Sequence, residues 1–333
     1  NLKAMLLEEQ KPIEEKPLKL VDLDFPKLKP DEVLLKVKCC GVCRTDLHIV
    51  EGELKAVKLP LILGHQVLGE VVEVGSEVKS ELKGRIFGVP WLYWSCGKCK
   101  YCLNGFENLC RNALFTGYSV DGGYSEYMIA KASYIHEIPE GLDVLHAAPL
   151  LCGGAIGYRA FKMAKVNSGD KLGLFGFGSS AHMILQLAKY LGIEVYVFTR
   201  SKDSQQLALN LGASWVGEPR ESIEETLDAA IVFAPAGWVA IEALKKLDRG
   251  GRLILAGIYM TPIEKINYQD IWLEKEMKSV ANVTRNDVKE FLELASKVKI
   301  KTKITIYSLE DANEALKSLK YGEHSGSIVL KMS

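Results

Sequence analysis

A run of about thirty residues in the second half of the chain combines three secondary-structure signals in a fixed order. Residues 171–175 form a short apolar run typical of a buried strand, residues 182–191 have helical periodicity, and residues 194–198 form a second apolar run. The sequence G-F-G-S-S-A at 176–181 separates the first strand from the helix. A strand, a glycine turn, a helix and a second strand together predict a dinucleotide-binding unit.

Five residues of the glycine turn have distinct expected roles. Gly176 permits the tight turn, Gly178 lets the backbone approach a pyrophosphate, and Ala181 is small enough for the helix to pack on the strand. Ser179 and Ser180 open the helix, where free backbone N–H groups face the anion.

The same kind of pattern continues downstream. Residues 229–233 and 252–256 are further buried strands, and residues 238–247 form a helix that Gly250-Gly251 is expected to end. Strands that alternate with helices predict an α/β fold with a doubly wound parallel sheet.

The end of the second strand lacks the acidic residue that would bind the ribose 2′-hydroxyl of NAD. Thr199, Arg200 and Ser201 stand there instead, followed by Lys202. Hydroxyl and guanidinium groups suit a 2′-phosphate, which a carboxylate would repel. We therefore predict that NADP is preferred and that NAD is also used. The alternative is that Arg200 and Lys202 are ordinary surface charges.

The first half of the chain has a different character. Strand-like runs at 32–40, 67–74 and 123–130 are separated by Gly and Pro, and no long amphipathic helix is evident. This pattern predicts an antiparallel, barrel-like domain.

Four cysteines in that domain have the spacing C-x₂-C-x₂-C-x₇-C. They are Cys96, Cys99, Cys102 and Cys110. Four thiolates this close predict a closed, structural zinc site. An iron–sulfur cluster, a disulfide pair and a zinc ribbon of a binding module are the alternatives, but the lobe is embedded in a β domain rather than free-standing.

A second group of metal-binding residue types is scattered along the chain. Cys43, His65 and Cys152 make a Cys₂His set, which in catalytic zinc sites leaves the fourth position open. Taken singly, each residue has a structural alternative, because free cysteines are commonly buried and a core histidine can simply be hydrogen-bonded.

Composition excludes several classes of function. Lysine plus arginine and aspartate plus glutamate are equal at 42 each, so the basic excess expected of a nucleic-acid-binding protein is missing. No run of about 18 apolar residues predicts a membrane span, and residues 1–19 lack a signal-peptide core. Eight closely spaced cysteines favour metal sites over disulfides and predict a cytoplasmic protein.

Taken together, these motifs resemble the zinc-containing alcohol dehydrogenases of the medium-chain dehydrogenase/reductase superfamily, and most of all the bacterial propanol-preferring branch. The resemblance rests on GVCRTDLH at 41–48, GHQVLGEVVEVG at 64–75, the four-cysteine lobe, LLCGGAIGYRA at 151–161, GFGSSA at 176–181 and SVANVTRNDVKEFLELA at 279–295. It covers nearly the whole chain.

The resemblance implies a GroES-like catalytic domain built from residues 1–150 and 291–333, with a zinc lobe at about 91–112. A Rossmann domain at 151–290 is inserted between the two parts. It also implies two zinc ions per chain, a small alcohol or aldehyde substrate and a homo-oligomer, either a dimer or a tetramer. The expected reaction is the reversible oxidation of a primary alcohol, or of a secondary one, by NAD(P).

The resemblance also implies roles for individual residues. Thr45 and His48 resemble the proton relay, Asp46 the carboxylate that orients the ligand histidine, Arg44 a pyrophosphate contact, and Trp91 an aromatic wall of the substrate pocket.

One residue departs from the broad family, in which Glu usually follows the ligand histidine. Gln66 stands there, and its amide oxygen is a weaker candidate ligand for zinc. Two other functions remain as alternatives: a zinc-bearing nucleotide-binding or sensor protein without turnover, and a zinc-free quinone reductase of the same superfamily.

Overall fold

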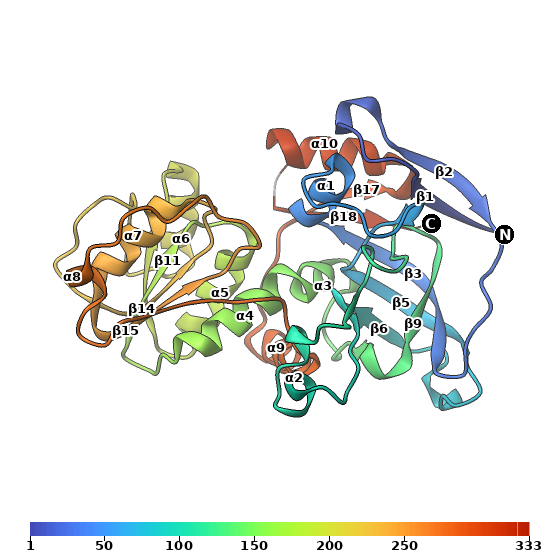
Figure 1. The fold of residues 1–333 in the computed structure, drawn as a ribbon, viewed down its shortest axis with the longest axis horizontal. Helices are drawn as coiled ribbons and strands as arrows, with labels where there is room; N and C mark the ends of the chain where they lie inside the picture. Colours follow the sequence, from blue (N-terminus) through green and yellow to red (C-terminus); the bar gives the residue numbers. More distant parts are fainter. Residues whose placement is uncertain (325, 333) are drawn as a thin grey trace. The chain divides into compact units, whose positions relative to one another are not determined.

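The computed structural model describes residues 1–324 and 326–332. Contacts divide the chain into two compact units (Figure 1). Unit 1 comprises Asn1–Cys152, Asn282–Ser296 and Lys301–Ser333, and unit 2 comprises Gly153–Ala281 and Lys297–Ile300.

Unit 1 has more β-strands than helices, and among its described residues the paired strands are antiparallel except for β17 with β18. Its strands are β1 (Leu2–Leu7), β2 (Leu18–Leu23), β3 (Glu32–Val42), β4 (Leu61–Ile62), β5 (Val67–Val74), β6 (Ile86–Val89), β7 (Leu92–Trp94), β8 (Leu114–Phe115), β9 (Tyr127–Lys131), β10 (His136–Glu137), β17 (Ile304–Ser308) and β18 (Ser327–Lys331). Its helices are α1 (Arg44–Glu51), α2 (Lys100–Leu103), α3 (Val144–Ala147), α9 (Arg285–Val298) and α10 (Ala312–Tyr321). The last two residues of α9 are assigned to unit 2. The prediction of an antiparallel β domain is confirmed.

The longest strand, β3, organises the main sheet of unit 1. It pairs with β5, β9 and β18 and is buried along most of its length. The predicted strand at 32–40 continues to Val42 and ends one residue before Cys43. The sheet therefore fixes the position of the backbone at Cys43, the first candidate zinc ligand, where the strand pairing ends.

The end of the chain returns to unit 1. Strand β18 pairs antiparallel with β3, placing Ile328 opposite Val42 and Val329 opposite Gly41. Helix α10 packs beside α1, which Figure 1 shows. Lys320 Nζ on α10 binds carboxylate oxygens of Glu51 and Glu14 at 2.9 and 2.7 Å. The residues just before and within α1 are thus held by segments from both ends of the chain.

The strand predicted at 123–130 begins later than expected, at Tyr127. The backbone N–H groups of Gly122, Gly123 and Tyr124 instead donate to the carbonyls of Ile62, Gly64 and Leu63. These residues pair with the segment before His65 rather than with β3. The prediction was therefore wrong for the first four residues.

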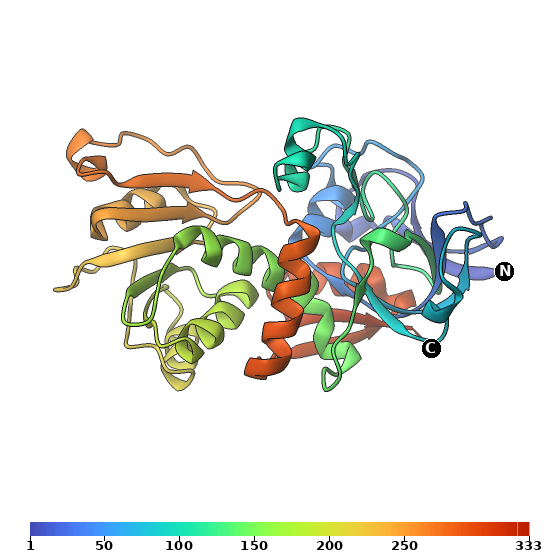
Figure 2. The same ribbon diagram turned by 90° about the horizontal axis from the view of Figure 1, so that it is seen from below.

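Unit 2 contains a six-stranded parallel sheet in the order β13-β12-β11-β14-β15-β16. Its strands are β11 (Lys171–Phe175), β12 (Glu194–Phe198), β13 (Trp215–Gly217), β14 (Leu227–Val232), β15 (Leu247–Leu255) and β16 (Glu276–Ser279). Its helices are α4 (Gly153–Ala164), α5 (Ser179–Tyr190), α6 (Lys202–Asn210), α7 (Gly237–Lys246) and α8 (Tyr268–Ile271). Helices α4 and α5 pack together along the sheet (Figure 2). The predicted α/β doubly wound parallel sheet is confirmed.

The largest boundary error in unit 2 concerns the start of β15, which was predicted at residue 252 and lies at Leu247. Helix α7 ends at Lys246, and Gly250-Gly251 lie within β15 rather than closing the helix. Gly250 has a φ of 68°, which marks an irregular point within the strand and not the cap of a helix.

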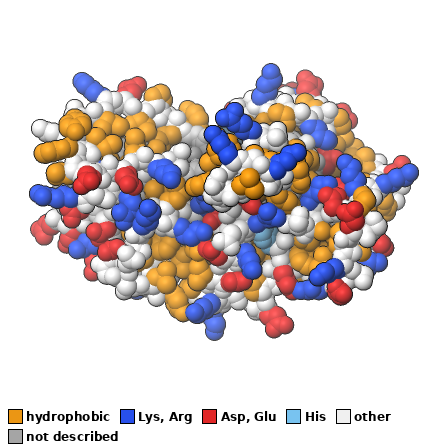
Figure 3. Space-filling view, turned by 60° about the horizontal axis from the view of Figure 1, so that its bottom comes forward, with side chains coloured by type: hydrophobic (Ala, Val, Ile, Leu, Met, Phe, Trp, Pro, Cys, Tyr) orange, Lys and Arg blue, Asp and Glu red, His pale blue; other side chains and the backbone are white. Residues whose placement is uncertain are grey.

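Each unit has its own apolar core. Among residues 1–324 and 326–332, no helix combines the length and the hydropathy needed to cross a membrane. On the face drawn in Figure 3, basic and acidic side chains are interspersed.

Candidate functional site

Helix α1 begins at the first candidate zinc ligand. Cys43 is its N-cap residue, and its backbone N–H donates to Asp46 Oδ2 at 3.0 Å, while the Cys43 side chain accepts from the backbone of Asp46. This reciprocal capping box fixes the entry of the chain into the helix. It also commits the buried Asp46 to a single orientation.

Cys43, His65 and Cys152 lie together, all within unit 1. His65 Nε2 is 3.3 Å from the Cys43 sulfur and 3.5 Å from the Cys152 sulfur. A tetrahedral zinc ion with Zn–S near 2.3 Å and Zn–N near 2.0–2.1 Å holds sulfur and nitrogen roughly 3.5 Å apart. The three side chains therefore fit a zinc ion.

The electrostatics of this cluster favour a bound cation. The pKa of the Cys43 thiol lies well below its usual value, because Cys152 hydrogen-bonds to it and His65 faces it. Burial opposes a charge on His65, but the charges of Cys43 and Asp46 outweigh that effect and raise its pKa to about 10. The hydrogen bond to Cys43 raises the pKa of the Cys152 thiol. Zinc requires thiolates and a neutral imidazole, so its binding displaces a proton from His65 and one from Cys152.

Asp46 contacts Nδ1 of His65, the ring nitrogen that does not face the two sulfurs. Its Oδ1 lies 3.3 Å from His65 Nδ1, an ion-pair distance, and neither atom has another partner in the part of the chain that the structure describes. The hydroxyl of fully buried Tyr124 donates to Asp46 Oδ2 at 3.0 Å. A carboxylate on Nδ1 fixes the tautomer that leaves Nε2 free to bind metal. Sequence reasoning missed Tyr124, because it lies far from Asp46 in the chain.

The relay candidates lie on the same helix. Thr45 and His48 are three residues apart on α1, so they project from one side of it, and both are partly exposed. His48 Nδ1 lies 2.9 Å from Glu53 Oε2, a carboxylate that was not predicted to take part. Arg44, in the first turn, is exposed.

Trp91 contacts His65, and Gln66 follows His65 in the chain. The Trp91 ring meets the imidazole edge to face with centroids 4.9 Å apart, and it stacks with Phe115 and Tyr118. The Gln66 side chain is buried against Gly41, where an added Cβ would lie 2.6 Å from Gln66 Oε1. The absence of a side chain at 41 makes room for this amide.

The four cysteines of the lobe also lie within ligand distance of one another. The sulfurs of Cys96 and Cys102 are 4.0 Å apart, close to the roughly 3.8 Å expected on a tetrahedral ion. Backbone N–H groups of Cys99 and Cys102 donate to the sulfurs of Cys96 and Cys99. Hydrogen bonds from backbone N–H groups, that of Lys98 first among them, lower the pKa of Cys96 to about 6. The lobe can therefore hold thiolates and, with Cys110 as fourth ligand, close around one zinc ion.

A salt bridge ties this lobe to α9. Arg285, the first residue of α9, binds both oxygens of Glu107 with nitrogen–oxygen distances of 3.0–3.3 Å, and its guanidinium stacks on Tyr134 at 4.2 Å. A bidentate pair of this kind is geometrically specific. We call it the lobe latch.

In unit 2, the glycine turn follows β11 as predicted. Gly176 has a φ of 92°, a conformation that L side chains rarely adopt, and a Cβ there would approach the backbone of Ala234. Gly178 is the N-cap of α5, and a Cβ on it would meet no protein atom within 4 Å. Ser179 and Ser180 form the first turn of α5, and Ala181 is fully buried. The helix N-terminus thus faces open space that suits an anion.

The run after β12 caps the next helix. The Ser201 hydroxyl oxygen accepts the backbone N–H of Ser204 as the N-cap of α6. The Thr199 N–H donates to the Gly217 carbonyl at 2.8 Å, which joins the ends of β12 and β13. Arg200 is exposed, and its guanidinium lies over the Trp238 ring.

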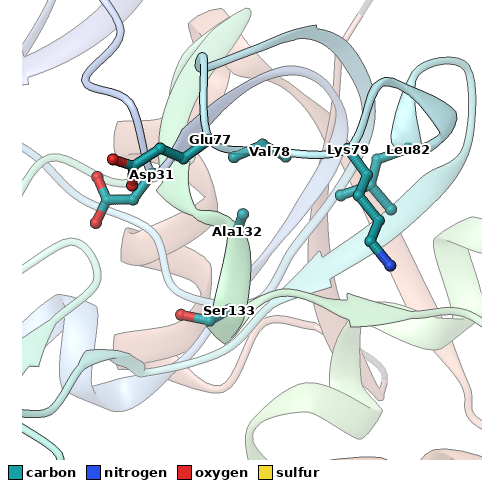
Figure 4. Close-up of a pocket in the computed structure, with 7 residues that line it drawn as sticks. All are labelled: Asp31, Glu77, Val78, Lys79, Leu82, Ala132 and Ser133. Atoms are coloured by element: carbon teal, nitrogen blue, oxygen red, sulfur yellow. The ribbon is translucent and has the colours of Figure 1, made fainter.

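A surface hollow of about 340 Å³ lies away from these residues (Figure 4). It is lined by Asp31, Glu77, Val78, Lys79, Leu82, Ala132 and Ser133. None of the candidate ligands or cofactor residues lines it, and its lining holds neither histidine nor cysteine. The metal clusters and the glycine turn, not this hollow, define the candidate site.

Comparisons with known proteins agree with this chemistry. A family model described as "Alcohol dehydrogenase GroES-like domain" matches residues 29–140, and one described as "Zinc-binding dehydrogenase" matches residues 181–297. The chain is 42% identical to a probable alcohol dehydrogenase, AdhA, of Mycobacterium tuberculosis, over 96% of this chain and 94% of the relative.

Two solved structures resemble the chain over almost its full length. An acetophenone reductase from Geotrichum candidum, in complex with NAD, has a TM-score of 0.88 at 27% identity and covers 99% of this chain and 97% of its own. The protein CAD from Helicobacter pylori, complexed with NADP(H), has a TM-score of 0.86 at 27% identity, with the same coverages. One of these relatives holds NAD and the other NADP(H).

Proposed function

The chain belongs to the zinc-dependent alcohol dehydrogenases of the medium-chain dehydrogenase/reductase superfamily, and from that premise we propose which of its residues carry the reaction and which cofactor it prefers. It is an oxidoreductase that uses zinc and a nicotinamide cofactor to oxidise small alcohols, with a GroES-like and a Rossmann domain. The alternative of a sensor without turnover is not favoured by relatives that are named alcohol dehydrogenases. Residues 1–150 and 291–333 are the proposed catalytic domain, and residues 151–290 the cofactor domain.

The observation that carries the residue assignment is the Cys43–His65–Cys152 cluster at the start of α1. These three residues would hold the catalytic zinc, and Gln66 is a weaker, fourth candidate. When bound, zinc supplies Lewis-acid chemistry that lowers the pKa of a hydroxyl group. Asp46 orients His65, and Trp91 forms an apolar wall for the substrate.

The proton and the hydride leave the alcohol by separate routes. The Thr45 hydroxyl accepts the substrate's hydroxyl proton and passes its own to His48, which Glu53 orients and which releases a proton to water. A bound nicotinamide would supply the hydride acceptor for the carbinol carbon, whose C–O bond becomes the carbonyl. Arg44 contacts the cofactor's pyrophosphate.

Alcohol-dependent reduction of NADP and NAD, measured together with elemental analysis, tests this function. We expect turnover with two zinc ions per chain. Primary alcohols, of which 1-propanol represents the propanol-preferring branch, and secondary alcohols form the substrate panel. Cofactor binding without turnover on any alcohol would instead support a sensor.

Replacing His48 with alanine tests the relay. Turnover is expected to fall by roughly 10²-fold, the usual contribution of general acid–base help, and its pH dependence should change because a proton acceptor is removed. His146→Ala is the matched control, because His146 is also paired with a carboxylate, that of Asp143 at 2.6 Å. An unchanged kcat–pH profile in His48→Ala would mean that the proton leaves by another route.

We propose that NADP is preferred over NAD. Gly176, Gly178, Ser179, Ser180 and Ala181 form the pyrophosphate turn for either cofactor. Thr199, Arg200 and Ser201 stand where a carboxylate would bind the ribose of NAD, and they offer hydroxyl and guanidinium donors to a 2′-phosphate.

The double substitution Thr199→Asp/Arg200→Ala is expected to reverse this preference. It removes a charge-assisted contact worth roughly 1.5–3 kcal/mol, or about ten- to a hundred-fold in affinity, and adds a carboxylate that repels the phosphate. The measurement is kcat/KM for both cofactors, with Lys245→Ala, a surface charge on α7, as control. A wild-type enzyme that favours NAD tenfold or more would make Arg200 an ordinary surface charge.

We also propose a homo-oligomer, with a dimer formed at the open edge of the parallel sheet. Strand β16 pairs only with β15 among the described strands, and Tyr268 and Trp272 just before it are 74% and 56% exposed. If two copies pair antiparallel about Met277, Glu276 of each lies opposite Lys278 of the other. Size-exclusion chromatography with light scattering distinguishes a dimer from a tetramer.

A charge swap tests this edge. Lys278→Glu places like charges opposite each other and is expected to raise the dimer Kd by at least about tenfold. The double swap Glu276→Lys/Lys278→Glu should restore it. A single swap that leaves the assembly unchanged would place the interface elsewhere.

Finally, we propose a cytoplasmic location. All eight cysteines are free thiols, and the six in the two proposed zinc sites must stay reduced to bind zinc, which a reducing compartment provides.

A further inference from the structure

Three side chains from separate segments of unit 2 meet around one indole ring. The guanidinium carbon of Arg200 lies 5.0 Å from the centroid of Trp238, and that of Arg220 lies 4.0 Å from the same centroid. We propose that these three residues form the subsite for the 2′-phosphate of adenosine, with Arg220 as a second phosphate ligand and Trp238 as the platform that holds both guanidiniums. This inference rests on the proposed preference for NADP and names residues that the run at 199–201 does not include.

The topology places this group where a dinucleotide is bound in such sheets. Arg200 follows β12 by two residues, Arg220 follows β13 by three, and Trp238 is the second residue of α7, which follows β14. The carboxyl ends of parallel strands lie at one edge of a sheet. The glycine turn follows β11, the strand between β12 and β14, so it lies at the same edge.

The charge of the group favours an anion. Neither guanidinium forms an ion pair with a carboxylate of residues 1–324 and 326–332, although Glu218 and Glu221 flank Arg220 in the sequence. Both arginines are exposed, and their attraction to the ring keeps two like charges close together. An anion that bridges them relieves this repulsion.

A phosphate monoester suits this arrangement better than a ribose hydroxyl does. Guanidinium groups bind phosphate through paired N–H donors, and each charge-assisted contact is stronger than a neutral one. The ribose 2′-hydroxyl of NAD is uncharged and cannot form such a contact. The pair of arginines should therefore distinguish the two cofactors, while the glycine turn treats them alike.

The experiment measures binding of adenosine 2′,5′-bisphosphate and of adenosine 5′-monophosphate to the zinc-loaded full chain by calorimetry. Arg220→Gln is expected to weaken the bisphosphate about ten- to a hundred-fold and to leave the monophosphate within about twofold. Trp238→Leu should also weaken the bisphosphate selectively, because the guanidiniums lose their platform. Arg249→Gln is the matched control, since this exposed arginine lies near the amino end of β15, away from the edge in question.

The outcomes separate this inference from the proposal beneath it. If the wild-type protein prefers the bisphosphate but Arg220→Gln does not change that preference, NADP is still favoured and Arg220 has no part in it. If Arg220→Gln weakens both nucleotides equally, Arg220 contacts the shared adenosine and not the 2′-phosphate. A wild-type protein that binds both nucleotides equally would overturn the NADP proposal itself. Unchanged bisphosphate binding in Trp238→Leu would remove the platform from the subsite.

Discussion

Replacing Cys43 with alanine is expected to lower kcat/KM by at least about 10³-fold while the fold is retained. The substitution removes one of the three residues that we propose as ligands of the catalytic zinc, so we expect that zinc to be lost. A loss of this size corresponds to roughly 4 kcal/mol of transition-state stabilisation, within the several kcal/mol that a Lewis-acid metal supplies.

The fold should survive because the backbone part of the α1 cap does not depend on the thiol. The Cys43 N–H still donates to Asp46, and losing the side-chain half of a capping box costs about 1 kcal/mol. The measurements are elemental analysis, which should show one zinc per chain instead of two, and far-ultraviolet circular dichroism, which should be unchanged. Cys39→Ala, which removes a buried thiol outside both clusters, should keep both zinc ions and the activity. Full activity in Cys43→Ala would remove Cys43 from the ligand set.

Replacing Cys102 with alanine should have the opposite profile, with a large loss of stability and a small loss of activity. The lobe contains only a four-residue helix, α2, and a three-residue helical turn at Glu107–Leu109. Helices this short are not stable alone, so the metal supplies the folding free energy of the lobe. We expect a cost of several kcal/mol, seen as a fall of roughly 5–10 °C in the thermal midpoint.

Because of the lobe latch, unfolding of the lobe in Cys102→Ala should also be detectable in α9. When the lobe unfolds, Arg285 loses both oxygens of Glu107, so the start of α9 should lose protection in hydrogen exchange along with residues 96–110. At low temperature, turnover should remain within about tenfold of wild type, because Cys43, His65 and Cys152 are unaffected. A variant that keeps two zinc ions and its thermal midpoint would show that the lobe does not need this thiolate.

Sequence patterns predicted the secondary structure best where burial alone decides it. Strands β5, β11 and β12 were predicted to the residue. Strands β11 and β12 are buried after their first residue, and β5, whose last residues are partly exposed, ends directly before Gly75. The error at Gly250 arose because a glycine pair after a helix was taken as its end, whereas β15 pairs with β14 on both sides of that pair, at Leu247 and from Arg252 onward. The start of β9 was misplaced for a related reason, since Gly122 and Gly123 pair with the segment before His65.

For the site, cysteine and histidine spacing brought out both metal clusters, because few other roles suit such residues at that spacing. Tyr124 and Arg220 could not be found in this way. Each of them lies on a different segment of the chain from its partner, and no motif near it in the sequence indicates its role. Glu53 could have been found, since it lies five residues after His48, just beyond the end of α1.

The pairing of β18 with the last residues of β3 has a consequence for synthesis on the ribosome. Cys43 emerges early, but the strand that pairs with Gly41 and Val42 is made nearly 290 residues later. At about 5–20 residues per second, this delay is roughly 15–60 s. All four cysteines of the lobe lie within residues 96–110, so this cluster is complete long before β18 is made. We therefore expect the structural ion to bind first, on the nascent chain, and the catalytic ion to bind only once β18 has paired with β3.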